Sequence, residues 1–124
     1  ELATVSPAIA GRLLELAGGR PEAITGLHVP RAAQDGDEAA LEAFRVIGTW
    51  LGQGMAALTA VLDPELFVLG GGVSAAGELL RDPAERSLQE RITARAYRQV
   101  PAVRLAEFGP EAGIVGAADL ARRR

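Results

Sequence analysis

Three consecutive glycines, Gly70–Gly72, are the residues whose type and spacing point most directly to a binding function. They follow the apolar run Leu66–Leu69, which is typical of a short strand buried on both faces, as in a parallel sheet. In open α/β sheets, ligands bind outside the carboxyl ends of strands, and a turn without side chains can admit a nucleotide against the backbone. The same glycines also suit a strand-to-helix turn that merely needs positive φ, so the triplet by itself leaves both hypotheses open.

The titratable side chains form no recognisable catalytic set. Every aspartate has an adequate explanation in a turn, in a helix cap or on the surface; the aspartates are Asp35, Asp37, Asp63, Asp82 and Asp119. His28 is the only histidine, and no ligand partners lie near it in the sequence, so we assign it no role. The absence of cysteine excludes disulfides and thiolate metal sites within this chain. The sequence therefore predicts neither a catalytic residue nor a metal ligand here.

Composition narrows the class of protein. The length of 124 residues suits one domain, and a hydrophobic content of 48% with only 4% aromatics favours close packing of alanine-rich helices. A net charge of -3 gives no electrostatic case for binding nucleic acid. No secretory signal is recognised, and the uncharged stretch Val46–Leu62 is too short and too polar for a membrane helix. We therefore expect neither a membrane nor a nucleic acid as a direct partner.

Helices are expected before the glycine turn. The pair Ser6–Pro7 is typical of a helix start, and Gly18–Gly19 would end that helix. Thr25 could cap a second short helix to about Gln34, which Pro30 would weaken.

A long helix should follow, capped by Asp37 and running to about Leu62. Its apolar stripe would consist of Leu41, Phe44, Leu51, Met55, Leu58 and Leu62. A second stripe has small residues at every fourth position: Gly48, Gly52, Ala56 and Ala60. Glycine costs a helix interior about 1 kcal/mol relative to alanine, so the glycines at positions 48, 52 and 54 predict close approach of another helix or a sheet.

After the glycines, the sequence predicts a helix, a second strand and a last helix. Asp82 would cap the first of these helices, with Pro83 as its first residue and Glu85 completing a capping box. Its inward residues would be Leu88, Ile92 and Ala96, and a solvated basic stripe would contain Arg91, Arg95 and Arg98. The second strand is expected over Val103–Phe108, and Gly109–Glu111 would open the last helix.

This order predicts a helical region over residues 1–62 and a strand-helix-strand-helix region over residues 63–124. The two strands should be parallel and joined by the helix between them. Two strands make a poor sheet, because an apolar strand with one neighbour leaves an open edge and uncovered faces. We therefore expect the chain to be part of a larger α/β protein.

Short motifs run along nearly the whole chain: Ser6–Ile9, Ile24–Gly26, Ala33, Gly36–Asp37, Trp50–Gly52, Leu62–Glu65, Leu69–Ser74 and Gly109–Ala118. Together they resemble the C-terminal portion of ROK-family proteins, most closely the bacterial glucokinases of that family. The first motif departs from the family's pattern, since Pro7 stands where a glycine is usual. The resemblance implies an α/β protein with the actin/hexokinase-like (ribonuclease H-like) ATPase fold, in which two α/β domains flank a cleft.

The resemblance also implies a role for the glycine turn, because in sugar kinases of this fold that turn belongs to the adenosine-binding region. On this basis, the nucleotide-binding candidates are Gly70, Gly71 and Gly72, together with Val73 and Ser74. The family has a sugar-contacting glutamate four residues before the serine of its helix start. Glu1 lies five residues before Ser6, so it is either a sugar ligand in a shifted register or part of a flexible terminus.

The family's catalytic parts are missing from this chain. Family kinases carry an Asp-x-Gly-x-Thr phosphate loop, an Asn-Asp pair that supplies the base, and a histidine with a cysteine cluster that holds zinc. The resemblance therefore implies a chain that is inactive alone and belongs to a cytoplasmic, homo-oligomeric glucokinase of glycolysis. That parent would bind glucose, ATP with Mg²⁺ and a structural Zn²⁺. The catalytic groups and the zinc ligands would lie outside this chain, which would supply part of the nucleotide-binding wall.

Two alternatives stay open. The family also includes sugar-responsive transcriptional repressors, in which a DNA-binding helix pair precedes the same domain. The chain could also be a non-catalytic folding or dimerisation module whose small-residue helices form an interface. The residues upstream of Glu1 would discriminate between a kinase and a repressor.

Overall fold

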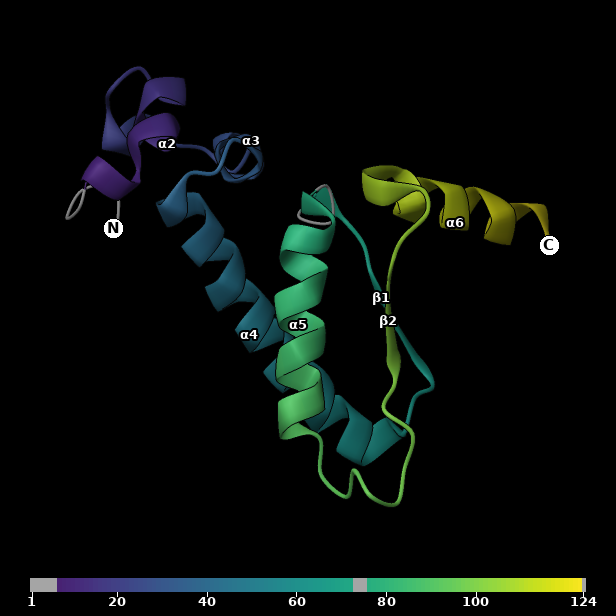
Figure 1. Cartoon of the computed structure of the whole chain (residues 1–124). Coiled ribbons are helices and arrows are strands. Elements are labelled where there is room, and N and C mark those ends of the chain that lie inside the picture. Colours follow the sequence, from purple (N-terminus) through teal and green to yellow (C-terminus); the bar gives the residue numbers. More distant parts are fainter. Residues whose placement is uncertain (1–6, 73–75, 124) are drawn as a thin grey trace. The chain divides into compact units, whose positions relative to one another are not determined.

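The computed structural model describes residues 7–72 and 76–123 (Figure 1). The elements in chain order are the 3₁₀ helix η1 (Pro7–Ile9), α2 (Gly11–Leu16), η2 (Pro21–Ala23), α3 (His28–Gln34), α4 (Glu38–Leu62), β1 (Leu66–Leu69), α5 (Glu78–Arg91), β2 (Ala102–Leu105), η4 (Gly109–Glu111) and α6 (Ala112–Arg122). The chain divides into two compact units, Glu1–Val46 and Ile47–Arg124. The long helix α4 contributes residues to both units.

Small side chains fill the core of the first unit. Leu13 and Phe44 are its large buried side chains; the others are Ala10, Ala17, Ala32, Ala33, Ala39 and Ala40. The helix α4 begins where the sequence predicts, because Oδ1 of Asp37 accepts a 3.0 Å hydrogen bond from the amide of Ala40. The alanines leave room for the helices to approach one another closely.

The start of α3 differs from the prediction. Thr25 does not cap this helix, which begins at His28. The amide of Thr25 instead donates to Nδ1 of His28 over 3.3 Å, and the amide of His28 donates to the carbonyl of Thr25 over 3.0 Å. Pro30 therefore lies in the first turn, where a backbone N–H has no partner within the helix, so the proline is tolerated there. The predicted cap Ser6 lies outside the described residues.

The second unit contains a two-stranded parallel sheet joined by a crossover through α5 (Figure 1). Leu66 pairs with Ala102, and Leu69 pairs with Leu105. One core packs the strands against α4 and α5; its buried members are Met55, Ala56, Ala84, Leu88, Ile92 and Val103, flanked by Leu51, Phe67, Leu69 and Val100. The predicted parallel strand-helix-strand unit is confirmed.

The predicted burial of β1 on both faces is wrong within this chain. Phe67 and Leu69 pack on the core, whereas Leu66 is 48% exposed and Val68 is 58% exposed. The reason is that α4 and α5 contribute the core residues against one face only, and no other described element supplies buried residues against the opposite face.

The helix α5 begins earlier than predicted. Gly77, at φ 60°, precedes its first residue Glu78, so Asp82 is not its cap and Pro83 lies inside it. Pro83 has no N–H to bond within the helix, and its ring packs on the side-chain-free surface of Gly48 in α4: a Cβ placed on Gly48 would lie 2.6 Å from Cγ of Pro83. The capping-box prediction is therefore wrong, since tertiary packing overrides the local signal.

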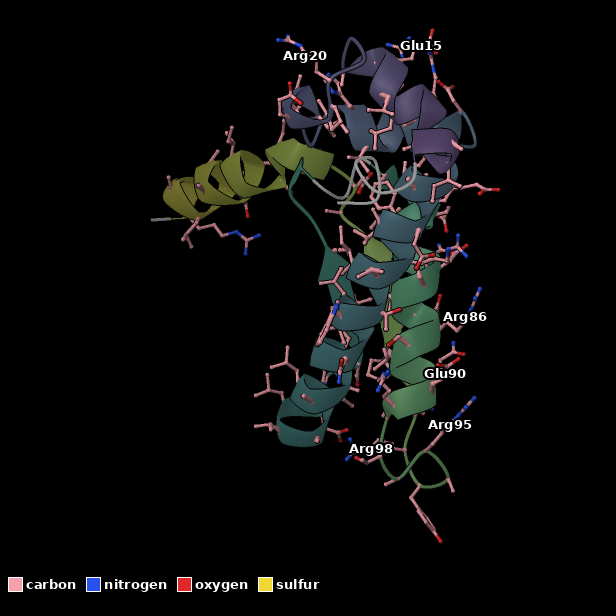
Figure 2. All side chains as sticks on the ribbon, turned by 90° about the vertical axis from the view of Figure 1, so that its left-hand side faces the viewer. Glu15, Arg20, Arg86, Glu90, Arg95 and Arg98 are labelled. Carbon is pink, nitrogen blue, oxygen red and sulfur yellow. The ribbon has the colours of Figure 1, made fainter. Side chains whose placement is uncertain are left out.

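The helix α5 also ends too early to carry the predicted basic stripe of Arg91, Arg95 and Arg98. It stops at Arg91, so the predicted inward residue Ala96 is exposed, while Leu88 and Ile92 are buried as predicted. Arg95 and Arg98 lie beyond the end of the helix (Figure 2). Nη1 of Arg98 donates a 3.0 Å hydrogen bond to the carbonyl of Thr59 near the end of α4, so this arginine helps to hold a helix end rather than a helical stripe.

The C-terminal part of α4 is more exposed than the periodicity of its apolar residues predicts. Leu58, Leu62 and Ala60 are exposed, although Phe44, Met55 and Ala56 are buried as expected. The last helix α6 contributes no buried side chain among the described residues. Several faces that the sequence pattern predicts to be buried are thus not covered by the described residues.

Candidate functional site

The carboxyl ends of β1 and β2 meet at one edge of the sheet, because the strands are parallel. This carboxyl edge consists of residues 70–72 after β1 and residues 106–109 after β2 (Figure 1). The amide of Ala106 donates a 2.8 Å hydrogen bond to the carbonyl of Leu69, which extends the strand pairing by one residue. A Cβ placed on Gly70 would lie 3.5 Å from Cβ of Ala106, an ordinary contact. The tertiary structure therefore brings the predicted glycine turn next to the turn after β2.

The structure explains the glycine at position 71 but not the glycine at position 72. Gly71 has φ 85°, a conformation that residues with side chains rarely adopt, so its backbone requires glycine. Gly72 lies outside that region of φ, and a Cβ placed on it would meet no heavy atom within 4 Å among the described residues. Neither its conformation nor its described neighbours explain why Gly72 has no side chain. Among the described residues, nothing occupies the space next to it.

The other predicted binding residues lie outside the described residues. They are Glu1, Val73 and Ser74. The glycines at positions 70–72 are thus the part of the predicted site that the structure describes.

The turn after β2 was predicted to be strand as far as Phe108. The strand ends at Leu105 instead, and the amide of Gly109 donates to the carbonyl of Ala106 over 3.1 Å. The amide of Glu111 then donates to the carbonyl of Phe108 over 3.0 Å and opens η4. The side chain of Phe108 is 56% exposed. The Gly109–Pro110 pair is the sequence signal that could have marked this turn.

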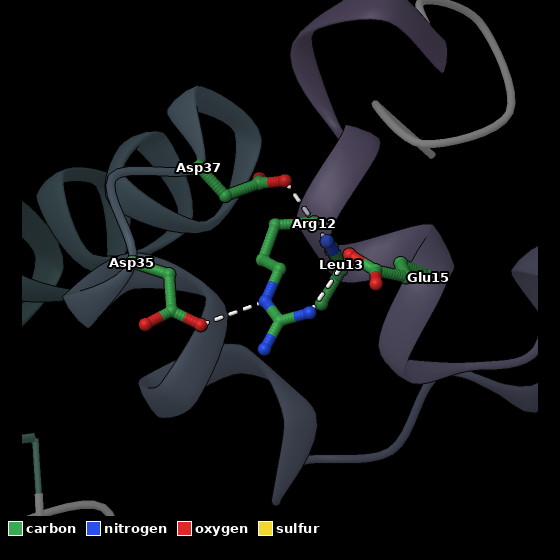
Figure 3. A network of polar contacts seen from close by, with 5 residues as sticks. All are labelled: Arg12, Leu13, Glu15, Asp35 and Asp37. Atoms are coloured by element: carbon green, nitrogen blue, oxygen red, sulfur yellow. Dashed lines mark hydrogen bonds and ion pairs between the residues drawn. The ribbon is translucent and has the colours of Figure 1, made fainter.

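A polar network in the first unit joins α2 to the residues before α4 (Figure 3). The guanidinium of Arg12 donates 2.7 Å hydrogen bonds to Asp35 and to Glu15, and these carboxylates raise its pKa, Asp35 having the largest effect. A hollow of about 370 Å³ borders this network, lined by Ala8, Ile9, Gly11, Arg12, Asp35, Gly36, Asp37 and Glu38. Because the arginine is held by two carboxylates, the network has the character of a structural link rather than of an anion site.

Residues 7–72 and 76–123 contain no group of three or more histidine or acidic side chains arranged to hold a metal ion. Within the same ranges, no helix has both the length and the apolar character needed to span a bilayer.

Known proteins resemble this chain over almost its whole length. Glucokinase from Streptomyces coelicolor is 40% identical over 120 residues, which are 97% of this chain and 38% of that protein. Glucokinase from Thermotoga maritima is 32% identical over 108 residues, which are 86% of this chain and 33% of that protein. A crystal structure of a ROK family glucokinase from Streptomyces griseus in complex with glucose and AMPPNP matches with a TM-score of 0.93 and 41% identity, covering 98% of this chain and 39% of that one.

These matches confirm the helix-rich α/β fold with two parallel strands, which corresponds to part of a ROK glucokinase structure. The chain spans well under half of the length of the relatives that it matches. The sequence profile of the ROK family matches residues 5–124. Because the match extends over nearly all of its residues, the chain belongs to the ROK family.

Proposed function

We propose that this chain is the C-terminal part of an ATP-dependent glucose 6-phosphotransferase and forms part of the wall around the adenosine. The observation that carries the proposal is the close match to the Streptomyces griseus glucokinase, whose structure contains glucose and an ATP analogue. The carboxyl edge supports it, because a glycine turn at the end of a parallel strand lies where α/β sheets bind ligands.

In this function the chain binds rather than reacts. The glycine turn at residues 70–72 presents backbone to the nucleotide, and the open surroundings of Gly72 accommodate it. The reaction transfers the γ-phosphoryl group of ATP to the 6-hydroxyl of glucose, and a base takes the hydroxyl proton. The base belongs to the remainder of the protein, as does the sugar site. The chain alone is then inactive.

The described residues do not fit a metal ion. The carboxylate of Asp37 is already engaged by two backbone amides, and Asp35 by Arg12, so neither is available as an open ligand. Any Mg²⁺ or Zn²⁺ that the complete enzyme uses would bind outside the described residues. Because ATP is the phosphoryl donor of cytoplasmic metabolism, the proposed enzyme acts in the cytoplasm. The exposed apolar residues Trp50, Leu66 and Val68 support the separate proposal that it is a homo-oligomer.

The proposal is tested by Gly72→Val in the complete protein that contains this chain. A Cβ at this position meets no described heavy atom within 4 Å, so we expect the protein to fold normally, whereas the valine side chain would occupy the space of the nucleotide. We expect the KM for ATP to rise by about tenfold or more while the KM for glucose stays within about twofold, which corresponds to a loss of about 1.4 kcal/mol in nucleotide binding. Steady-state kinetics with each substrate varied in turn measures both constants.

The matched control is Gly54→Val, because a Cβ placed on Gly54 also meets no described heavy atom within 4 Å, and Gly54 lies within α4 rather than at the carboxyl edge. This control should leave both constants unchanged. Gly71 is a poor choice for the test, since its positive φ would strain any side chain irrespective of ligand. Equal changes in both constants for Gly72→Val, in a protein that is still folded, would mean that the turn is only structural.

A further inference from the structure

Phe108 is an exposed aromatic residue at the carboxyl edge. Aromatic residues make up only 4% of this chain. Phe44 is buried and Phe67 packs on the core, whereas Tyr97 and Trp50 are exposed on other segments. Phe108 is thus the aromatic side chain that follows directly on a strand at the edge where a ligand is expected.

The turn that carries Phe108 is held in place by backbone hydrogen bonds. The bonds from Gly109 to Ala106 and from Glu111 to Phe108 close two successive turns. The bond from Ala106 to Leu69 ties the same segment to the end of β1. Figures 1 and 2 both show η4 beside the end of β1. The exposed ring therefore stands on a defined backbone, close to the glycine turn.

The charge of this turn indicates which part of a nucleotide it can accept. Residues 106–111 include two carboxylates, Glu107 and Glu111, and no basic side chain. A triphosphate would be repelled there, whereas an uncharged purine would not. A flat aromatic or apolar surface is also what a base stacks on.

We propose that Phe108 contacts the purine base and determines the preference of the enzyme for ATP over nucleotides with smaller bases. This inference rests on the proposed function and adds a residue that neither the glycine motif nor the sequence pattern assigns. The base lies against the ring of Phe108, and the glycine turn lets the rest of the nucleoside approach the sheet. Stacking depends on the area of the base, so a purine gains more from the ring than a pyrimidine does.

The test compares Phe108→Ala with Phe108→Trp in the complete protein. Removing the ring should raise the KM for ATP about tenfold with little change in the KM for glucose, whereas tryptophan, which keeps an aromatic face, should stay within about threefold of the parent. The ratio of kcat/KM for ATP to that for UTP should fall in the alanine variant. Because the side chain is exposed, neither variant should change thermal stability appreciably.

Tyr97→Ala is the matched control, because Tyr97 is 92% exposed and precedes β2 at the opposite edge of the sheet. This variant should leave both KM values and the ATP to UTP ratio of kcat/KM unchanged. An unaltered ATP to UTP ratio in Phe108→Ala would overturn the inference, as would equal changes in both KM values. If Gly72→Val weakens ATP binding while Phe108→Ala does not, the role of Phe108 is refuted and the proposed function survives. If the complete parent protein has no glucose phosphotransferase activity, the proposed function itself fails.

Discussion

A single buried carboxylate caps two helices of the first unit. Oδ1 of Asp37 accepts from the amide of Ala40 in the first turn of α4. Its Oδ2 accepts a 2.9 Å bond from the amide of Leu13 in the first turn of α2 (Figure 3). Both amides belong to the group that a helix cannot satisfy by itself. The residue therefore links two helices whose starts lie far apart in the sequence.

Replacing this carboxylate should cost more than replacing its exposed neighbour. Losing one helix cap costs about 1 kcal/mol, and Asp37→Ala removes two caps and leaves buried amides without a partner. We expect the free energy of unfolding to fall by about 3 kcal/mol, measured by chemical denaturation of the complete protein. Asp35→Ala, which removes only an exposed ion pair with Arg12, is the control and should have a much smaller effect. Equal losses would show that the double cap does not stabilise the unit.

The arginine ion pairs add no pH dependence near neutrality. Hydrogen bonding to Asp35 raises the pKa of Arg12, and hydrogen bonding to Asp82 raises the pKa of Arg81. A group whose pKa is raised on folding stabilises the protein fully below its unfolded pKa and loses that contribution as the pH rises through the folded value. Because arginine already titrates far above neutral pH, both pairs persist across the physiological range.

Two glycines of α4 allow α5 to pack closely against it. A Cβ placed on Gly52 would lie 2.5 Å from Cβ of Ser87 and 2.7 Å from the backbone nitrogen of Leu88. Oγ of Ser87 also donates a 2.9 Å hydrogen bond to the carbonyl of Thr49. The predicted close approach at Gly48 and Gly52 is thus confirmed, and α5 is the partner. At Gly54 the prediction is wrong, because a Cβ placed there meets no described heavy atom within 4 Å, and nothing in the described residues explains this glycine.

Replacement by alanine should have opposite effects on stability at Gly52 and at Gly54. Gly52→Ala forces a methyl group into the backbone of α5, so we expect a loss of about 2 kcal/mol or more in the free energy of unfolding. Gly54→Ala meets no neighbour and should instead stabilise the helix by about 0.5–1 kcal/mol. Denaturant unfolding of both variants measures the difference. A neutral Gly52→Ala would indicate that α4 and α5 separate without cost.

Within the second unit, several apolar faces are left uncovered. A hollow of about 430 Å³ on α4 is lined by Ile47, Trp50, Leu51, Gly54, Met55 and Leu58. Trp50 is 69% exposed, and one face of β1 is open at Leu66 and Val68. Soluble monomers rarely expose contiguous apolar patches beyond about 300–600 Å². These faces are therefore expected to be covered, either by other parts of a longer chain or by a second copy.

When studied alone, the 124-residue chain should self-associate. Burial of apolar area contributes roughly 25 cal/mol per Å² before the cost of association, and a symmetric dimer is the commonest closed arrangement. Sedimentation at micromolar concentration measures the mass. A well-folded monomer under these conditions would contradict the prediction and would mean that the chain covers its own strands in solution.

Local signals allowed much of this structure to be predicted from the sequence. The cap at Asp37, the long helix α4 and the end of that helix at the Asp63–Pro64–Glu65 turn depend on neighbouring residues, as does the strand Leu66–Leu69. The parallel crossover followed from the order of the elements. The conjunction of motifs along the chain indicated the ROK family, and the glycine turn indicated one half of the candidate site.

Features that depend on distant partners were decided only by the tertiary structure. The sequence predicts a helix start at Pro83. In the structure α5 begins at Glu78, and Gly48, a residue of a different helix, accommodates the ring of Pro83. The sequence predicts strand as far as Phe108, but the pairing of β2 ends at Leu105, so Phe108 lies in the turn that begins at Ala106, next to Gly70. Caps and turns are encoded by residues in contact along the chain, whereas packing and strand register depend on residues that meet only after folding.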